Sequence, residues 1–360
     1  MLLLLYVAFA LAQWSQLSQN GPALLTTDPN AMPDATSLAP MWCVNSDVYV
    51  LTTHLWKFET TTSRWLWQPD SFIPLRTSAA YWTMRNILYL YGGLDANGTV
   101  LSDMWSYNPL TRVPTYIGSY LPVSGAAFWI HSQSNRLYVW GGGVQLRAFD
   151  VTTNQWSDVA YTGGGPAQTA YGSATIAGNV AYVYNGDKLW SLDLSTFVWK
   201  QSMVGITAPP GPSRIYSTLW ASPNVMLYGG SAGSQIYSDT WSYASNQWNL
   251  LTNNVGPSPR QRFSTCVNVN NSLVLFGGDL SNDLWMYGPK TDLTLLQKLE
   301  VGLQSAVLWS FASAILSALL LLCFTLLGIF LCLKSCRNRR NAGMSSTVKL
   351  AGRSDDFAQL

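Results

Sequence analysis

The amino-acid sequence predicts an all-β fold: a six-bladed β-propeller closed by an N-terminal strand and followed by one transmembrane α-helix. Three observations predict this arrangement. A β-rich apolar stretch that ends in glycine recurs through most of the 360 residues, a further strand-like segment precedes the first repeat, and a long uncharged apolar run follows the last. Short strands at a fixed period are typical of propeller blades.

The repeated strand is the clearest feature of the sequence. Five copies end in glycine: LYLYGG at Gly93, LYVWGGG at Gly143, AYVYNG at Gly186, VMLYGG at Gly230 and LVLFGG at Gly278. VYVLTT, which ends at Thr53, is a sixth copy without the glycines. Glycine permits backbone angles that other residues avoid, as the tight exit from a strand close to a neighbouring blade requires. We therefore expect one blade for each copy.

An aromatic stretch follows each copy and predicts the third strand of a blade: WKF at 56–58, WSY at 105–107, RAF at 147–149, WSL at 190–192, WSY at 241–243 and WMY at 285–287. The fourth strands are marked by Trp65, Trp156, Trp199 and Trp248, with Val113 in the corresponding place of the second blade. The double glycine, the aromatic strand and the tryptophan together resemble the kelch repeat. The resemblance covers residues 13–290 and implies a six-bladed propeller of the kelch and galactose oxidase type.

The sixth blade has no fourth strand of its own, because Gly288-Pro289-Lys290 follows its third strand directly. Gln13-Trp14-Ser15-Gln16-Leu17, before the first blade, has the composition of an unpartnered fourth strand. We expect this segment to complete the sixth blade, because a closed ring leaves no open sheet edge.

Two segments predict passage through the secretory pathway. Residues 1–12 are apolar and end in Ala10-Leu11-Ala12, as in a cleaved signal peptide. After a stalk at 291–304, residues 305–333 predict a transmembrane helix, and the tail 334–360 begins with a basic cluster that should stay cytoplasmic. The propeller should therefore be extracellular or luminal in a single-pass type I membrane protein. We expect the plasma membrane, with the Golgi and endosomes as open alternatives.

The five cysteines divide along the same boundary. Cys43 and Cys266 occupy matching places in the first and last repeats, so a disulfide is conceivable. We favour two free buried thiols, because inner strands of neighbouring blades are expected to lie too far apart for a bridge. Cys332 and Cys336 are candidates for palmitoylation at the cytoplasmic edge of the membrane.

Two Asn-X-Ser/Thr sequons, at Asn97 and Asn270, fall in predicted loops and are candidate glycosylation sites. Residues 13–304 are nearly neutral, with 14 Lys and Arg against 16 Asp and Glu, and have no basic stripe, which argues against a nucleic-acid partner. The tail could instead meet anionic lipid headgroups.

The sequence offers few groups for catalysis, and we expect no catalytic residue, metal or cofactor. His54 and His131 lie at different structural positions of blades one and three, which argues against the copper site of a galactose oxidase-type enzyme. Resemblance to secreted six-bladed kelch proteins that act on sialic acid implies one enzymatic alternative, a sugar epimerase or mutarotase. His131, Arg214 and Arg262 would be its nearest acid or base groups.

A proline followed by arginine recurs in the connections that enter blades two, five and six: Pro74-Leu75-Arg76, Pro212-Ser213-Arg214 and Pro259-Arg260-Gln261-Arg262. They contain four candidate ligand-binding residues: Arg76, Arg214, Arg260 and Arg262. Arginine forks bind carboxylates, so the predicted ligand is a protein, or an acidic peptide or glycan. The alternative is a structural role in which each arginine bonds loop carbonyls. Asp103, Asp239 and Asp283 share one offset from a strand aromatic, which favours a turn-forming role in which they bond local backbone.

The main functional hypothesis is a non-enzymatic binding module on a membrane anchor. A receptor-like or trafficking adaptor, in which the tail recruits cytosolic partners, is a further alternative.

Overall fold

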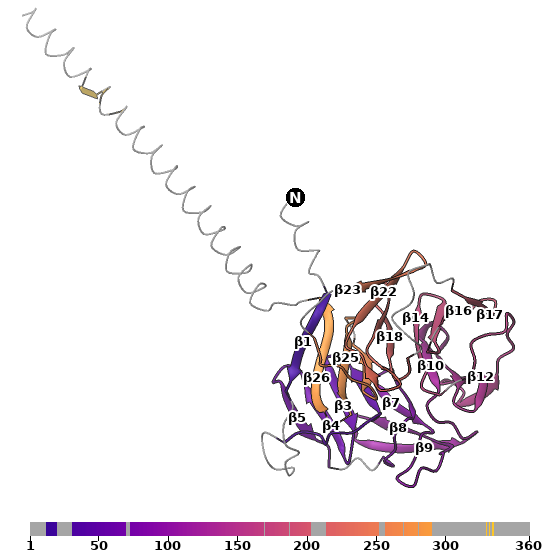
Figure 1. Ribbon diagram of the computed structural model, residues 1–360. Coiled ribbons are helices and arrows are strands. Elements are labelled where there is room, and N and C mark those ends of the chain that lie inside the picture. Colours follow the sequence, from indigo (N-terminus) through magenta and orange to yellow (C-terminus); the bar gives the residue numbers. More distant parts are fainter. Residues whose placement is uncertain are drawn as a thin grey trace, which may run out of the picture. The chain divides into compact units, whose positions relative to one another are not determined.

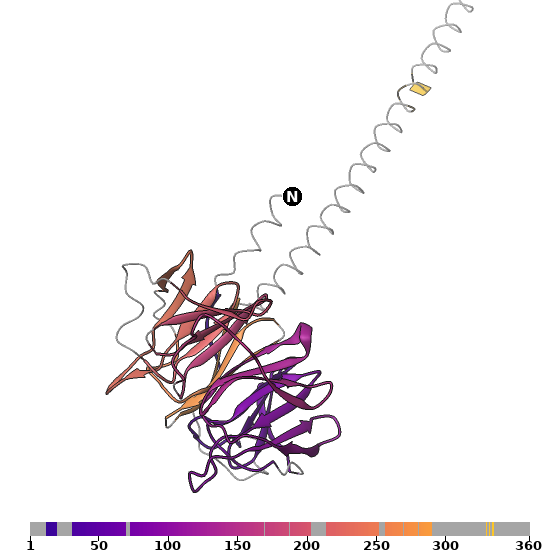
Figure 2. The same ribbon diagram turned by 90° about the vertical axis from the view of Figure 1, so that its right-hand side faces the viewer.

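A computed structural model of the chain describes residues 12–19, 31–69, 73–168, 170–186, 188–202, 214–251, 256–268, 270–279, 281–289, 329, 331, 333 and 334. The chain divides into two compact units, Met1–Lys290 and Thr291–Leu360. Within the first unit, six four-stranded antiparallel sheets surround a common axis, which confirms the six-bladed propeller (Figures 1 and 2).

Blades one to three follow one another in the sequence. Blade one comprises β2 (Met41–Val44), β3 (Asp47–Leu51), β4 (Leu55–Glu59) and β5 (Arg64–Trp67). Blade two comprises β6 (Ala80–Met84), β7 (Ile87–Tyr91), β8 (Asp103–Asn108) and β9 (Val113–Ser119). Blade three comprises β10 (Ala127–His131), β11 (Arg136–Gly141), β12 (Val144–Asp150) and β13 (Gln155–Asp158), with a short 3₁₀ helix at Ser132–Ser134.

Blades four to six complete the ring. Blade four comprises β14 (Ser173–Ala177), β15 (Val180–Tyr184), β16 (Leu189–Asp193) and β17 (Val198–Gln201). Blade five comprises β18 (Thr218–Ala221), β19 (Val225–Tyr228), β22 (Thr240–Ala244) and β23 (Gln247–Leu251), with a small hairpin of β20 (Ser231–Ala232) and β21 (Gln235–Ile236). Blade six comprises β24 (Ser264–Val267), β25 (Leu273–Gly278), β26 (Ser281–Pro289) and β1 (Ala12–Ser18).

The N-terminal strand closes the ring, as the sequence predicts. β1 pairs antiparallel with β26, and Trp14 lies opposite Tyr287 (Figure 1, where indigo β1 lies beside orange β26). Trp14 is 3% exposed and donates a hydrogen bond from Nε1 to Oγ1 of Thr240 in blade five, at 3.1 Å. The first described strand of the chain is therefore part of the last blade and of its interface with the blade before.

The hydrophobic core of the described propeller consists of six clusters, each between two neighbouring blades. β3 shows why the sequence gives this arrangement, because successive side chains of a strand point to opposite faces of its sheet. Val48 and Val50 pack against blade six, whereas Tyr49 and Leu51 pack against blade two. The continuous apolar run of each second strand therefore supplies two interfaces at once.

The glycine pairs mark close approaches between segments of backbone. Gly93 has a φ of 97°, and a Cβ at this position would lie 2.6 Å from the carbonyl oxygen of Thr77. Gly230 in blade five has a φ of 91° and would meet the carbonyl oxygen of Ile215 at the same distance. Both positions exclude a side chain, as expected from the repeated motif.

Most of the predicted targeting segments lie outside the described residues. Ala12, the last residue of the predicted signal peptide, begins β1, and residues 329, 331 and 333 of the predicted span are helical. The stalk at 291–304, the cysteines 332 and 336, and the tail beyond 334 are not among the described residues. In the part of the chain that is described, no helix is long and apolar enough to cross a membrane.

Candidate functional site: the mouth of the central channel

The antiparallel order of strands sorts the connections of the propeller onto two faces. The connections between second and third strands, and those from a fourth strand to the next blade, lie at one face, which we call the mouth face. β1 begins and β26 ends at the opposite face, where Ala12 pairs with Pro289. The first and last described residues of the propeller therefore both lie at the face opposite the mouth.

Six residues, one from each connection that enters a blade, form a ring on the mouth face, which we call the mouth ring. All have positive φ angles: Leu38 54°, Ser78 57°, Gly125 62°, Tyr171 65°, Tyr216 58° and Arg262 55°. Backbone amides of this ring donate to the carbonyl of the equivalent residue in the preceding blade: Leu38 to Arg262 at 2.7 Å, Ser78 to Leu38 at 3.2 Å, Gly125 to Ser78 at 2.8 Å, Tyr171 to Gly125 at 2.6 Å and Tyr216 to Tyr171 at 3.4 Å.

Left-handed backbone angles are uncommon for residues with a Cβ, and large side chains in this region are outliers. Leucine, tyrosine and arginine hold these angles here because the blade-to-blade hydrogen bonds fix the backbone around the ring. The mouth ring is therefore a fixed frame that presents side chains from neighbouring blades to one opening.

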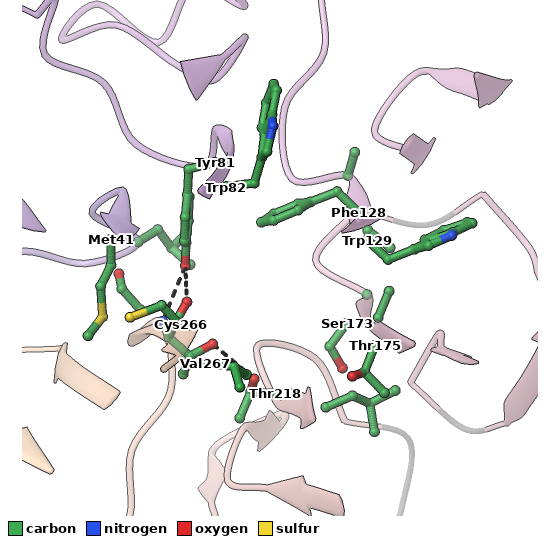
Figure 3. A pocket seen from close by; sticks show the side chains of 18 of the residues that line it. Met41, Tyr81, Trp82, Phe128, Trp129, Ser173, Thr175, Thr218, Cys266 and Val267 are labelled. Atoms are coloured by element: carbon green, nitrogen blue, oxygen red, sulfur yellow. Dashed lines mark hydrogen bonds between the residues drawn. The ribbon is translucent and has the colours of Figure 1, made fainter. Parts of the chain in front are cut away.

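A cavity with a volume of about 370 Å³ lies below the mouth ring and is lined by the inner strands of all six blades. Tyr81 and Phe128 form an aromatic side, while Ser173, Thr175 and Thr218 contribute hydroxyl groups on another side (Figure 3). Among the described residues, no Asp, Glu, Lys, Arg or His lines this cavity. Its chemistry suits an uncharged group rather than an ion.

Tyr81 extends from blade two past blade one to the inner strand of blade six. Its hydroxyl donates to the carbonyl oxygen of Thr265 and accepts from the backbone N–H of the same residue, both at 3.2 Å (Figure 3). Burial raises the pKa of Tyr81 to about 12, against hydrogen bonds at Thr265 and Ser264 that lower it. Tyr81 therefore remains a neutral phenol at physiological pH and satisfies backbone groups of β24.

Arg76, Arg214 and Arg260 do not lie on an accessible surface: they are 4%, 1% and 2% exposed. Each guanidinium forms a bidentate ion pair with an aspartate of its own blade. The shortest distances are 2.6 Å for Arg76–Asp103, 2.7 Å for Arg214–Asp239 and 2.7 Å for Arg260–Asp283. Each also donates to the carbonyl of the first glycine of the repeat pair: Gly92, Gly229 and Gly277.

These contacts match the structural alternative for the three arginines, because their forks already hold protein oxygens. A ligand could reach these buried guanidinium groups only by displacing their aspartates. Breaking an ion pair of a buried charge costs about 3 to 5 kcal/mol. We therefore do not retain Arg76, Arg214 and Arg260 as ligand residues.

The three aspartates differ from the turn-forming role expected from their spacing. Besides the arginine, each accepts a hydrogen bond from the indole Nε1 of the tryptophan two residues later: Trp105 at 2.6 Å, Trp241 at 2.7 Å and Trp285 at 2.7 Å. Burial raises the pKa of Asp103, but hydrogen bonds from Arg76 and Trp105 outweigh it, so the pKa lies below its usual value. The carboxylates thus link the mouth connections to the third strands.

Arg262 is the candidate that stays accessible, because it is equivalent to Ser78 and Tyr216 in the ring and not to the buried arginines. It is exposed, and its Cζ lies 5.0 Å from the ring centroid of Tyr216. The rings of Tyr216 and Tyr171 lie 4.5 Å apart. The shared pattern of a proline followed by arginine did not reveal this difference, because Arg260 and Arg262 are only two residues apart.

The candidate acid and base groups of a sugar epimerase do not converge. His131 is the last residue of β10, at the face opposite the mouth, where its Nδ1 lies 2.8 Å from Oγ of Ser134. Arg214 is buried in its ion pair, and Arg262 lies at the mouth. His54 is in the connection between β3 and β4, edge-on to Trp67. The described residues contain no group of three or more potential metal-binding side chains.

The expectation of free thiols at Cys43 and Cys266 is wrong. They form a disulfide between β2 and β24, the inner strands of blades one and six, with 5.6 Å between the Cα atoms. Neighbouring inner strands converge near the axis of the propeller, and this separation falls within the range for a disulfide. The bridge joins the first blade to the last across 223 positions of sequence.

The two sequons lie on opposite faces. Asn97 is exposed at the tip of the connection between β7 and β8, on the mouth face, where Asp95 Oδ1 accepts the backbone N–H groups of Asn97 and Thr99. Asn270 is exposed in the turn between β24 and β25, on the opposite face. Both asparagines are thus open to modification.

Comparison with known proteins agrees with the repeat pattern. Residues 111–278 match the family model of the KLHDC2/KLHL20/DRC7 Kelch-repeats domain. Kelch domain-containing protein 1 of Mus musculus is 23% identical over 304 residues, which cover 70% of this chain and 74% of that protein, and the Homo sapiens protein gives the same values. The solved structure of YjhT superposes with a TM-score of 0.59 and 18% identity, over 72% of this chain and 97% of that chain. These comparisons support a kelch-repeat domain in this chain, and its described residues fold as a six-bladed β-propeller.

Proposed function

We propose that this protein is a membrane-anchored binding module whose kelch propeller recognises a protein ligand at the mouth face. The observation that carries the proposal is the mouth ring, which surrounds a neutral cavity with accessible side chains from three neighbouring blades. Tyrosine and arginine are enriched among residues that dominate binding energy at protein interfaces. A glycan ligand is the alternative within the same proposal.

The propeller belongs, in this proposal, on the extracellular or luminal side of a membrane, with the plasma membrane as the expected location. The Cys43–Cys266 disulfide supports an oxidising compartment, because such bonds persist mainly in secreted and cell-surface proteins. The apolar segments 1–12 and 305–333 and the basic tail support a cleaved signal peptide and a single anchor. Exposed sequons at Asn97 and Asn270 fit the same side.

The enzymatic alternative receives no support from a particular contact, because its candidate groups lie apart and outside the cavity lining. The adaptor alternative rests on the tail beyond residue 334 and is not argued from the propeller. We therefore propose one function.

Site-specific photo-crosslinking in living cells tests recognition at the mouth face. A benzophenone amino acid replaces Ile215, 38% exposed beside Tyr216, in one variant of the full-length chain. In the matched variant it replaces Val113, 52% exposed at the start of β9 on the opposite face. We expect discrete protein adducts from position 215 and none from position 113. Equal adducts from both positions, or none from 215, would contradict the proposal.

Membrane anchoring is tested separately on the same cells. We expect the full-length chain to remain with membranes after alkaline extraction and to shift in mobility after glycosidase digestion. Release into the alkaline supernatant would remove the anchor from the proposal while leaving mouth-face recognition to the crosslinking result.

A further inference from the structure

Tyr171, Tyr216 and Arg262 come from three successive blades and form one cluster at the mouth, which we call the mouth cluster. The tyrosine rings lie 4.5 Å apart, tilted by 39°, and the Arg262 guanidinium carbon lies 5.0 Å from the centre of the Tyr216 ring. The two tyrosines are half-buried and also line the cavity, whereas Arg262 is exposed. The cluster therefore reaches from solvent to the cavity wall.

The charge of Arg262 is not neutralised within the described propeller. None of the ion pairs found there involves Arg262, whereas Arg76, Arg214 and Arg260 each pair with an aspartate. An aromatic face attracts a guanidinium without removing its charge or occupying all of its N–H donors. Arg262 therefore presents unused donors to solvent from a fixed platform.

Backbone geometry adds to this preorganisation. Tyr216 and Arg262 both have left-handed φ angles, and the carbonyl of Arg262 accepts the amide of Leu38 at 2.7 Å. Arg260, two residues earlier, is anchored by its buried ion pair with Asp283. A cation that is held before the ligand arrives loses less conformational entropy on binding.

The cavity beside the cluster favours an apolar group, whereas Arg262 favours an anion. Its lining is neutral, and Phe128 and Tyr81 supply large aromatic surfaces (Figure 3). An ionised group would lose its hydration there without a charged partner, whereas an apolar side chain would gain from burial. At about 370 Å³ the cavity is within the range of small ligand sites.

We propose that the mouth cluster recognises an acidic side chain of the protein ligand through Arg262, while a neighbouring apolar side chain of the same ligand enters the cavity. This inference rests on the proposed function and specifies the chemistry of the ligand at that site. The carboxylate accepts hydrogen bonds from the guanidinium, and Tyr216 keeps that guanidinium in place.

A phage-displayed library of random heptapeptides, selected on the full-length protein, provides the probe. We expect the selected peptides to contain Asp or Glu next to a large apolar residue. Synthetic copies are then titrated by fluorescence anisotropy, together with versions in which the acidic residue is changed to its amide. We expect Arg262→Gln to weaken binding about tenfold or more, the factor that corresponds to a lost charge-assisted hydrogen bond.

Arg112→Gln is the matched control, because Arg112 is also exposed with a left-handed φ of 58°, but between β8 and β9 on the opposite face. It should leave peptide affinity and the unfolding temperature unchanged, and Arg262→Gln should leave the unfolding temperature unchanged. In a double-mutant cycle, the amide peptide should lose no further affinity on the Arg262→Gln protein. Affinity of the acidic peptide should also fall as salt rises.

Selected peptides without acidic residues, or acidic peptides that bind Arg262→Gln as tightly as wild type, would overturn this inference. Position-specific crosslinks from residue 215 would then still support mouth-face recognition. Absence of any selected peptide together with absence of those crosslinks would overturn both proposals.

Discussion

Replacement of Trp14 by alanine is expected to destabilise the whole propeller, because this residue holds the ring closed. The indole is 3% exposed and lies against Tyr228 and Tyr287, with ring centroids at 4.7 and 5.3 Å. Its Nε1 donates to Thr240 in blade five at 3.1 Å, so one side chain connects the N-terminal strand to two blades. Loss of this side chain removes contacts from the last blade and from its neighbour.

The expected cost can be worked out from these contacts. Truncation of a buried tryptophan to alanine costs about 3 to 5 kcal/mol, and the lost hydrogen bond adds about 1 kcal/mol. This is a large part of the about 5 to 15 kcal/mol by which native proteins are stable. For a domain of this size, it corresponds to a fall in unfolding temperature on the order of 10 °C. Trp14→Phe retains most of the packing and should lose only about 1 to 2 kcal/mol.

Scanning calorimetry of the full-length chain measures the effect. Tyr116→Ala is the control, because Tyr116 is also an aromatic residue on the fourth strand of a blade, β9, but is 52% exposed. It should lower the unfolding temperature by a small fraction of the Trp14→Ala effect. An unfolding temperature for Trp14→Ala equal to wild type or to the control would refute the closure of the ring by β1.

Three further perturbations address the same framework. Asp283→Ala leaves Arg260 buried without its partner and should lower the free energy of unfolding, measured by chemical denaturation, by about 3 to 5 kcal/mol. A loss below about 1 kcal/mol would show that this ion pair does not stabilise the fold. Cys43→Ser opens the bridge to Cys266 and should lower the unfolding temperature by an amount equivalent to about 2 to 5 kcal/mol, the same as reduction of the wild-type protein. Because the pKa of Asp103 is lowered on folding, its carboxylate stabilises the protein at pH values above the unfolded pKa near 3.8, and this stabilisation should disappear as pH falls through the folded pKa. The same dependence of unfolding free energy on acidic pH in wild type and Asp103→Asn would contradict it.

The fold could be predicted from the sequence because each blade repeats a local pattern. The apolar second strand supplies two interfaces, and the glycine pair marks a backbone approach, so both leave a signal at each repeat. Ring closure was also predictable, since the sixth blade lacks a strand and Gln13–Leu17 has no other partner. The disulfide was not, because the separation of Cys43 and Cys266 depends on how far the inner strands converge at the axis.

The roles of the arginines could not be predicted from their own motif, because a proline followed by arginine does not identify the partner of the guanidinium. A second signal was present in the chain, however. Arginine and the Asp-X-Trp element occur together in blades two, five and six. In the sequences of blades one, three and four, the position of the arginine is Thr36, Val123 and Thr169, and none of these blades has the Asp-X-Trp element. Because the arginine and the Asp-X-Trp element are present or absent together in each blade, the sequence indicates that the two are in contact.

This internal correlation also accounts for the difference between Arg260 and Arg262. The arginine of each ion pair is buried and lies two residues before the mouth ring, so it anchors the connection and leaves the ring position free to vary. The ring position is serine in blade two, tyrosine in blade five and arginine in blade six, although the backbone angle is nearly the same in all three. Anchoring residues recur because the fold needs them, whereas the residues that can give the mouth its specificity are those that differ from blade to blade. A search for binding residues in such a ring should therefore begin where the repeats disagree at a shared backbone position. Here that criterion selects the mouth ring, in which Arg262 is the charged residue.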